Sequence, residues 1–320
     1  MTCRSVILAT GSYLPEKILT NKDIEKLVDT TDDWIVQRTG IRERHIAAPG
    51  QATSDMAIQA ARRALEASGL TPNDIDGVIV ATTTPDRSFP SVAVCVQAAL
   101  GLRAGPAFDV QAVCSGFVYA LSVADSFLRT GVMKRVLVIG AEKMSSLLNW
   151  EDRTTCVLFG DGAGAVILEA QTESDSGILS THLYADGKFR DLLYTDGGTS
   201  TTGTSGHIIM HGKEVFKNAV TLMSEIVQEV LDKNTITSDQ IDWLVPHQAN
   251  LRIIAGTAEK LNMSMEKVVV TVDKHGNTSA ASIPLALDTA VRDGRIQRGQ
   301  TLLLEALGGG LTWAAALIKY

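Results

Sequence analysis

The stretch that decides the fold is FDVQAVCSGF, residues 108–117. Its first half is rich in strand-forming residues, and from Gly116 to Gly131 small and apolar side chains recur at helical spacing. Cys114 therefore stands where a predicted strand ends and a predicted helix begins. Unpaired N–H groups and the positive end of the helix dipole favour a thiolate there, and the thiolate is the nucleophilic form of cysteine. Free cysteines are more often inert packing residues, so the stretch alone predicts an α/β protein with a candidate reactive thiol.

The composition indicates a globular chain and excludes several classes of protein. With 320 residues, 45% of them hydrophobic and 20% charged, the chain can form about two domain-sized cores. Its longest apolar runs are far shorter than a membrane span, and its first residues show no signal-peptide pattern, so we expect a cytoplasmic protein with no membrane partner. A net charge of -7 without any basic run argues against nucleic acid as a partner.

The cysteines and histidines do not form a metal-binding pattern. The four cysteines are Cys3, Cys95, Cys114 and Cys156. They have no C-x-x-C spacing, which fits a reducing compartment and argues against a zinc site. His207 and His211 are four residues apart, but no acidic or cysteine ligand accompanies them. We therefore expect no metal ion.

Apolar periodicity and turn residues predict alternating strands and helices along the chain. The expected elements of the first half are a strand at 6–9, helices from about 21, at 30–38 and at 54–68, a strand at 75–82, a helix that ends near 99, and a buried strand at 135–140. The glycine-rich residues 160–166 lead into a strand, whereas a dinucleotide-binding loop needs a strand before it and a helix after it. Polar residues 171–178 mark the boundary between two expected domains, 1–172 and 173–320.

The two halves resemble copies of one α/β unit. Leu65 and Leu231 are 166 positions apart (231 minus 65), and so are Ile75 and Ile241, where each isoleucine opens an apolar strand. Such a pair, with parallel strands and crossover helices, would bury two sheets between helical layers.

The repeat also predicts where the chemistry lies. Cys114 stands 17 residues before Gly131, and Asn277 stands 17 residues before Gly294 (294 minus 277), so we expect Asn277 to occupy in the second half the place that Cys114 has in the first. His247 ends a neighbouring predicted strand. Because ligands collect where strand ends and helix starts converge, the repeat predicts a thiol, an imidazole and an amide near one point.

Four motifs give the sequence a family resemblance. They are Cys114 in its strand-to-helix turn, PHQAN at 246–250, HGNTS at 275–279 and GGG at 308–310. With these motifs the chain resembles the β-ketoacyl-acyl carrier protein synthase III family over essentially its whole length, from GSYLP at 11–15 to Thr312 and Trp313. The resemblance implies a thiolase-like five-layer αβαβα fold, an α/β class made of two duplicated halves, and a homodimer.

The resemblance also implies a catalytic triad and a reaction. The triad is Cys114, His247 and Asn277, and the elongating synthases carry a second histidine where this chain has Asn277. The implied reaction is the decarboxylative Claisen condensation of an acyl-CoA primer, with acetyl-CoA expected, and malonyl-acyl carrier protein. It yields 3-oxoacyl-acyl carrier protein and initiates fatty acid synthesis. Backbone N–H groups of Cys114 and Gly309 would hold the oxyanion, and coenzyme A enters as a thioester substrate, so no separate cofactor is expected.

Further residues are implied by the resemblance alone, and ordinary packing or surface charge is the alternative for each. The expected coenzyme A contacts are Trp34 and Arg153 around the adenine, with Thr30, Arg38, Gly212, Phe216, Ala249 and Asn250 along the pantetheine tunnel. Phe89 would reach the acyl pocket of a partner subunit. The expected carrier-protein contacts are Lys217 and Arg252, with Lys213 and Lys260 nearby.

One departure and three alternatives leave the function open at this stage. Leu307 and Leu311 flank the glycine run where many members of the family carry phenylalanine, so the length of the primer is not fixed. The first alternative is a synthase III-like acyltransferase of secondary metabolism with another acyl acceptor. The others are a papain-type Cys-His-Asn hydrolase, in which the asparagine only orients the histidine, and a non-catalytic protein that binds the acyl carrier.

Overall fold

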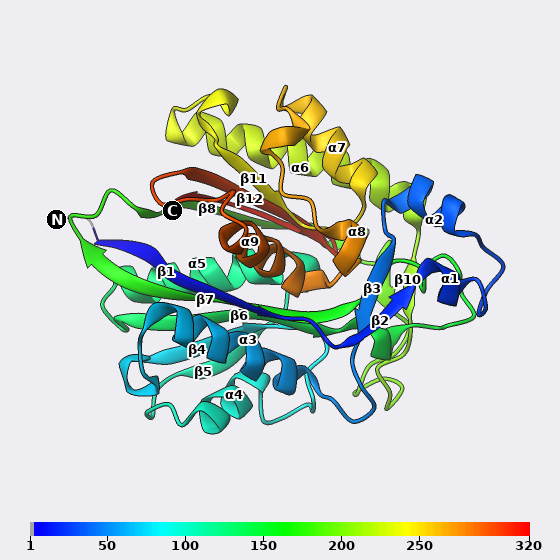
Figure 1. Cartoon of the computed structure of the whole chain (residues 1–320), viewed down its shortest axis with the longest axis horizontal. Coiled ribbons are helices and arrows are strands. Elements are labelled where there is room, and N and C mark those ends of the chain that lie inside the picture. The colour runs from blue at the N-terminus through cyan, green and yellow to red at the C-terminus, as the bar shows by residue number, and fades with distance from the viewer. Residues whose placement is uncertain (1–2) are drawn as a thin grey trace.

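The computed structural model describes residues 3–320 and consists of five layers. Figure 1 shows two sheets with one layer of helices between them and a further layer on each outer side. This order of layers is the expected one. No helix among the described residues has both the length and the apolar character that a bilayer span requires.

The first sheet is built from the N-terminal half. Its strand order is β1 (Cys3–Tyr13), β7 (Asp161–Thr172), β6 (Arg135–Lys143), β4 (Gly77–Ala81) and β5 (Ala107–Val110). The prediction of parallel strands is correct only for β4 with its neighbours β5 and β6. β7 runs antiparallel to both β1 and β6, because the chain returns from β6 to β7 through a loop rather than a crossover helix.

The second sheet is built from the C-terminal half and repeats this plan. Its strand order is β11 (Trp243–Pro246), β12 (Thr301–Gly308), β13 (Thr312–Lys319) and β8 (Gly177–Ala185). Only β11 and β12 are parallel. The fifth position is reduced to a single parallel bridge between Leu244 and Val268.

Six helices supply the three helical layers. α3 (Thr53–Ser68) and α4 (Val92–Leu100) cover the outer face of the first sheet, α6 (Gly212–Asn234) and α7 (Leu251–Lys260) cover the outer face of the second, and α5 (Gly116–Arg129) and α9 (Ser282–Arg292) lie between the sheets. Alanine-rich faces let the central helices pack closely, since Ala120, Ala124, Ala286 and Ala290 are all fully buried in one apolar cluster with both sheets.

Seven short elements complete the described part of the chain. They are β2 (Lys17–Thr20), α1 (Asn21–Ile24), α2 (Asp32–Thr39), β3 (Glu43–Ile46), β9 (Leu193–Thr195), β10 (Ile208–Met210) and α8 (Val272–His275). The predicted helix at 30–38 is α2, and its N-terminus is capped by the Thr31 hydroxyl, which accepts from the Trp34 N–H at 3.1 Å.

The two halves match at the turns that open their central helices, but not in the register expected from the sequence. Val113 (φ 50°) and Ser279 (φ 49°) are 166 positions apart (279 minus 113), and each opens a short 3₁₀ turn that leads into α5 or α9. The structural counterpart of Cys114 is therefore Ala280, and the prediction that Asn277 holds this place was wrong. The reason is that α9 has 11 residues and α5 has 14, so counting back from the glycines shifts the alignment by about one turn.

Candidate active site

Cys114 lies in the turn that joins β5 to α5. Its side chain is 3% exposed, and the residue before it, Val113, has a left-handed backbone (φ 50°) that a β-branched residue rarely adopts. The turn is fixed from the other half of the chain, because the Thr312 hydroxyl donates to the Ala112 carbonyl at 2.8 Å and the Ser115 hydroxyl donates to the Thr312 carbonyl at 2.9 Å. Strain that the surrounding structure over-determines is typical of functional sites.

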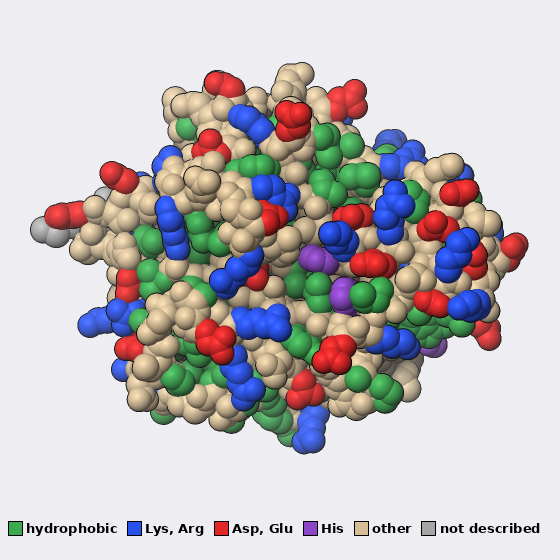
Figure 2. All heavy atoms as spheres, in the orientation of Figure 1, with side chains coloured by type: hydrophobic (Ala, Val, Ile, Leu, Met, Phe, Trp, Pro, Cys, Tyr) green, Lys and Arg blue, Asp and Glu red, His purple; other side chains and the backbone are tan. Residues whose placement is uncertain are grey.

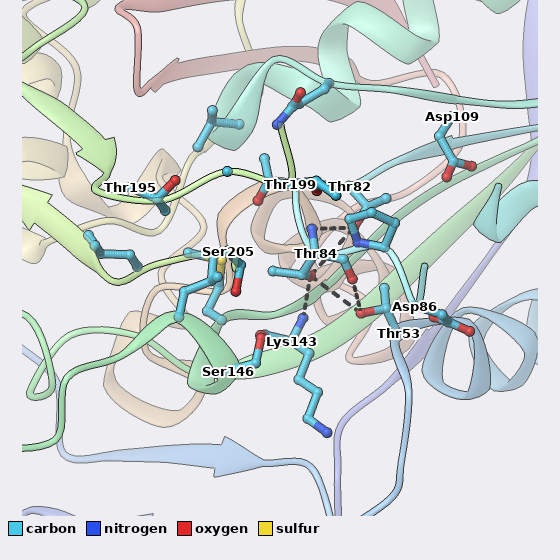
Figure 3. Close-up of a pocket in the computed structure, with 18 of the residues that line it drawn as sticks. Thr53, Thr82, Thr84, Asp86, Asp109, Lys143, Ser146, Thr195, Thr199 and Ser205 are labelled. Atoms are coloured by element: carbon cyan, nitrogen blue, oxygen red, sulfur yellow. Dashed lines mark hydrogen bonds between the residues drawn. The ribbon is translucent and has the colours of Figure 1, made fainter. Parts of the chain in front are cut away.

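Cys114 lines two spaces that meet at its side chain. One is a narrow cavity of about 110 Å³, which His247 and Asn277 also line. The other is a wide cleft of about 1160 Å³. Figure 3 shows the hydroxyl-rich wall of this cleft, where Thr53, Thr82 and Thr84 are joined by hydrogen bonds. The structure thus brings the three residues of the expected triad to one cavity, although Asn277 arrives there from a different register than the repeat suggested.

His247 directly follows β11. Its backbone N–H donates to the Glu305 carbonyl at 2.8 Å, which fixes the residue beside β12. Its Nδ1 atom lies 2.6 Å from the Ser282 hydroxyl oxygen. Burial lowers the pKa of the imidazole to about 3, so the ring is neutral at physiological pH.

Asn277 lies between α8 and the turn that opens α9. Its backbone N–H donates to the Leu158 carbonyl at 2.8 Å, and its carbonyl accepts from the Gly160 N–H at 3.0 Å. The side-chain oxygen accepts from the Ser279 N–H at 2.9 Å. This bond holds the amide so that its NH₂ group is left to serve as a donor in the narrow cavity.

The environment of the Cys114 thiol differs from the sequence expectation. Burial raises the pKa of the thiol to about 12, and the nearby Glu142 carboxyl acts in the same direction, whereas a hydrogen bond with the Ser279 side chain acts against them. The position at a helix start predicted a lowered pKa for the thiol. The loss of hydration on burial, which is not visible in the sequence, is the largest contribution and raises the pKa. A pKa this high keeps Cys114 as a protonated thiol at neutral pH.

This pKa predicts how the thiol reacts with an alkylating reagent. Because the thiolate fraction stays small below a pKa of about 12, the rate of Cys114 carbamidomethylation by iodoacetamide should rise about tenfold per pH unit from pH 7 to 10. Peptide mass spectrometry separates Cys114 from the partly exposed Cys3 and Cys95. A rate that levels off between pH 7 and 8 would show instead that the site stabilises the thiolate.

Glu142 and two serines are polar partners of the site that sequence reasoning missed. Glu142 is fully buried at the end of β6 and accepts from the Thr84 hydroxyl at 2.7 Å and from the Ser279 hydroxyl at 3.1 Å. Burial raises the pKa of its carboxyl. The signal in the sequence was a single acidic residue, next to the last residue of a strand whose centre is apolar. Ser279 and Ser282 lay inside a quoted motif or just after it, but nothing in the pattern distinguished them from cap residues.

The glycine run supports close backbone contact at Cys114. A Cβ atom on Gly308 would lie 2.8 Å from the Cys114 backbone nitrogen, so only glycine lets the two backbones approach. Gly309 lines the wide cleft together with Cys114. Leu307 lines the narrow cavity, and Leu311 is fully buried behind it in the same apolar cluster. The departure from phenylalanine therefore affects the wall of the narrow cavity.

The residues expected to contact coenzyme A form two groups. Gly212, Phe216, Ala249 and Asn250 line the narrow cavity. Trp34, Arg38 and Arg153 lie outside it, where both guanidinium groups stand 5.6 Å from the Trp34 ring centroid. The Asn250 amide donates to the Arg38 carbonyl at 3.0 Å and so connects the groups. The Thr30 hydroxyl oxygen is buried and has no hydrogen-bond partner among the described residues.

The remaining predicted residues are on the surface. Phe89 lies at the rim of the wide cleft and is 84% exposed. Lys213 and Lys217 on α6 and Arg252 and Lys260 on α7 are exposed. The Arg252 guanidinium lies 5.4 Å from the ring centroid of Phe216, which lines the narrow cavity. The face in Figure 2 mixes basic and acidic side chains without a broad patch of one sign.

Comparisons with known proteins show the family to which the chain belongs. The family model for 3-oxoacyl-[acyl-carrier-protein] synthase III matches residues 108–187, and the model for its C-terminal part matches 231–320. The Beta-ketoacyl-[acyl-carrier-protein] synthase III of Rhizobium meliloti is 59% identical over 99% of both chains, and that of a Bradyrhizobium strain is 57% identical over 100% of both.

Two solved structures that resemble this fold are also synthases of this kind. The 3-oxoacyl-[acyl-carrier-protein] synthase III of Aquifex aeolicus has a TM-score of 0.94 and 51% identity, covering 99% of this chain and 100% of its own. The priming β-ketosynthase of the R1128 polyketide pathway has a TM-score of 0.92 and 37% identity, covering 98% of this chain and 96% of its own. The fold is thus the thiolase-like fold of these synthases, as predicted. The chain belongs to the β-ketoacyl-acyl carrier protein synthase III family, the acyltransferases that carry out the initiating condensation with malonyl-acyl carrier protein in fatty acid synthesis.

Proposed function

We propose that Cys114, His247 and Asn277 carry out this condensation with an acyl-CoA primer, acetyl-CoA in the first instance. The observation that supports the proposal is that the three side chains line one narrow cavity, whose other walls are mostly apolar. Such a cavity suits the thin, uncharged arm of a pantetheine thioester. Coenzyme A is a substrate in this scheme, and the reaction needs no separate cofactor.

The first half-reaction loads the enzyme. The Cys114 sulfur attacks the primer thioester, the bond between the acyl carbon and the coenzyme A sulfur breaks, and the thiol proton leaves on free coenzyme A. Backbone N–H groups of Cys114 and Gly309 stabilise the oxyanion of the tetrahedral intermediate. The wide cleft beside Cys114 gives the acyl group room on the side away from the narrow cavity.

The second half-reaction forms the carbon–carbon bond. Malonyl-acyl carrier protein enters the narrow cavity and loses carbon dioxide, and N–H groups of His247 and Asn277 donate to the enolate oxygen. The enolate carbon attacks the acyl group on Cys114, the bond between the acyl carbon and the cysteine sulfur breaks, and the released thiolate takes up a proton from solvent. A neutral imidazole suits this role, because it acts as a donor without protonating the enolate carbon.

The outer residues bind the two carriers. Trp34, with Arg38 and Arg153 beside its ring, offers an aromatic surface and two cations for the adenine and phosphates of coenzyme A. Lys217 and Arg252 suit the acidic surface of a carrier protein, with Lys213 and Lys260 adding to the positive field.

The carrier surface can be tested by charge reversal. Arg252→Glu should raise the Michaelis constant for malonyl-acyl carrier protein about three- to tenfold, because a rim charge mainly affects encounter, and should leave acylation by acetyl-CoA unchanged. Lys134→Glu, which reverses an exposed charge between α5 and β6, is the matched control. An unchanged Michaelis constant in Arg252→Glu would exclude this surface.

We also propose a cytoplasmic homodimer. An exposed phenylalanine at the rim of the wide cleft is unfavourable in water, and Phe89 would be covered if it entered the acyl pocket of a partner subunit.

The proposed function is tested by offering acyl-CoAs of increasing length and branching, followed by malonyl-acyl carrier protein. Intact-mass spectra of the enzyme report the primer, and the product on the carrier protein reports condensation. Acetylated enzyme that yields 3-oxoacyl-acyl carrier protein supports the proposal. An acylated enzyme that transfers its acyl group only to another kind of acceptor would favour the secondary-metabolism alternative, to which the priming polyketide synthase among the similar structures points.

A further inference from the structure

Ser282 stands behind the imidazole of His247, on the side away from the substrate cavity. It is the first residue of α9 and only 1% exposed. Its hydroxyl oxygen lies 2.6 Å from Nδ1 of His247 and also accepts the backbone N–H of Gln248 at 3.3 Å. No other hydrogen bond to this hydroxyl occurs within residues 3–320.

The direction of the bond follows from counting hydrogens. A serine hydroxyl has one hydrogen to donate, and the Gln248 N–H can only donate, so the Gln248 contact leaves the hydroxyl hydrogen unused. If Nδ1 also carried a hydrogen, Ser282 would accept twice and its own buried hydrogen would have no acceptor, which is costly. If Ser282 donates to Nδ1, every group in the cluster is satisfied.

We infer that Ser282 donates to Nδ1 of His247 and thereby holds the imidazole in the tautomer that carries its hydrogen on Nε2. Since Nδ1 is occupied by Ser282, Nε2 is the ring nitrogen left for a ligand in the narrow cavity. Burial keeps the ring neutral, so only one nitrogen carries hydrogen. Ser282 is a positioning residue in this account, because it acts through His247 and does not touch the substrate.

The competing donor is itself fixed. The Gln248 side chain is fully buried, where its amide donates to the Pro246 carbonyl at 2.9 Å and its oxygen accepts from the Thr271 N–H at 2.8 Å. These bonds hold the Gln248 backbone against the start of α9. The Gln248 N–H therefore donates to the Ser282 oxygen whichever ring nitrogen of His247 carries the hydrogen.

The tautomer of His247 is inferred from its contacts alone, and only the effect of this tautomer on catalysis rests on the proposed function. In the condensation, the Nε2 hydrogen is the one that the enolate accepts, whereas a ring with its hydrogen on Nδ1 would direct a lone pair at the enolate and repel it. Residues 279–282 then orient both hydrogen-bond donors to the enolate. The Ser279 N–H orients the Asn277 amide, and the Ser282 hydroxyl keeps the hydrogen of His247 on Nε2.

The tautomer can be read without any activity. In protein labelled with ¹⁵N-histidine, the two ring nitrogens of a neutral histidine have well-separated shifts that identify the protonated one, and the His247→Gln variant identifies the His247 signals. At pH 7 we expect the wild-type ring to carry its hydrogen on Nε2. A hydrogen on Nδ1 would overturn the inference, even if the enzyme condenses as proposed.

Variants then test what Ser282 contributes. Ser282→Ala should mix the two tautomers, lower kcat for condensation about ten- to a hundredfold and leave Cys114 acylation unchanged, as expected for a residue that orients a catalytic group. The control is Ser5→Ala, which removes another fully buried serine whose hydroxyl has no partner among the described residues.

The failure of the inference and the failure of the proposed function are distinguishable. Ser282→Ala that condenses at the wild-type rate and keeps its hydrogen on Nε2 would show that Ser282 does not set the tautomer. If wild-type Cys114 is never acylated, the proposed function fails, and the ¹⁵N shifts still report the tautomer.

Discussion

Cys114→Ala is expected to abolish the acyl-enzyme. The variant has no nucleophile at the point where the narrow cavity meets the wide cleft, so intact-mass spectra after incubation with acetyl-CoA should show unmodified protein. Condensation should fall by at least about a thousandfold. The variant retains His247 and Asn277, so slow release of carbon dioxide from malonyl-acyl carrier protein should persist and shows that the fold and the second donor pair are intact.

Cys156→Ala is the matched control for this loss. Cys156 is also a fully buried free thiol, and burial raises its pKa to about 11, but it lines neither the narrow cavity nor the wide cleft. This variant should acylate at the wild-type rate. Acyl-enzyme on Cys114→Ala, or its loss from Cys156→Ala, would assign the nucleophile to a different residue.

The second large effect separates the half-reactions. His247→Ala and Asn277→Ala should both form the acyl-enzyme, because neither side chain holds the oxyanion of the loading step. Each should slow condensation about a hundredfold or more, since one oxyanion donor contributes roughly 3 to 4 kcal/mol in other enzymes. Single-turnover mass spectra measure loading, and product on the carrier protein measures condensation.

Asn277→Asp sharpens the experiment. The aspartate keeps an oxygen to accept the Ser279 N–H at 2.9 Å, so the turn should stay intact, but it replaces the donor NH₂ by a second acceptor. We expect condensation to be at least as slow as in Asn277→Ala, with loading preserved. Condensation at the wild-type rate in Asn277→Asp would show that the amide orients the turn and does not bind the enolate.

Local patterns predicted much of the fold. The strand-to-helix change around Cys114 and the helix that Gly69 closes both follow from residues near in sequence, whose backbone preferences are short-range. Strand direction did not follow, because β7 pairs antiparallel with β1, which is far from it in sequence, and with β6, to which a loop rather than a crossover helix connects it.

The candidate site could likewise be predicted from the sequence only in part. The identities of Cys114, His247 and Asn277 came from motifs, but their register came only with the structure, because α9 is shorter than α5 and the repeat loses alignment within it. The raised pKa of the Cys114 thiol and the roles of Glu142 and Ser282 depend on burial and on contacts between segments more than 30 residues apart. No pattern along the chain contains that information.

We propose that one cysteine, Cys114, carries the acyl group between two half-reactions in one cavity. The most direct measurement loads the wild-type protein with isotope-labelled acetyl-CoA, removes free coenzyme A thioester, and then adds malonyl-acyl carrier protein. We expect one labelled acyl group on the peptide that contains Cys114, and this label disappears as labelled 3-oxoacyl-acyl carrier protein forms. Label on any other residue, or product that forms while the label stays on Cys114, would contradict it.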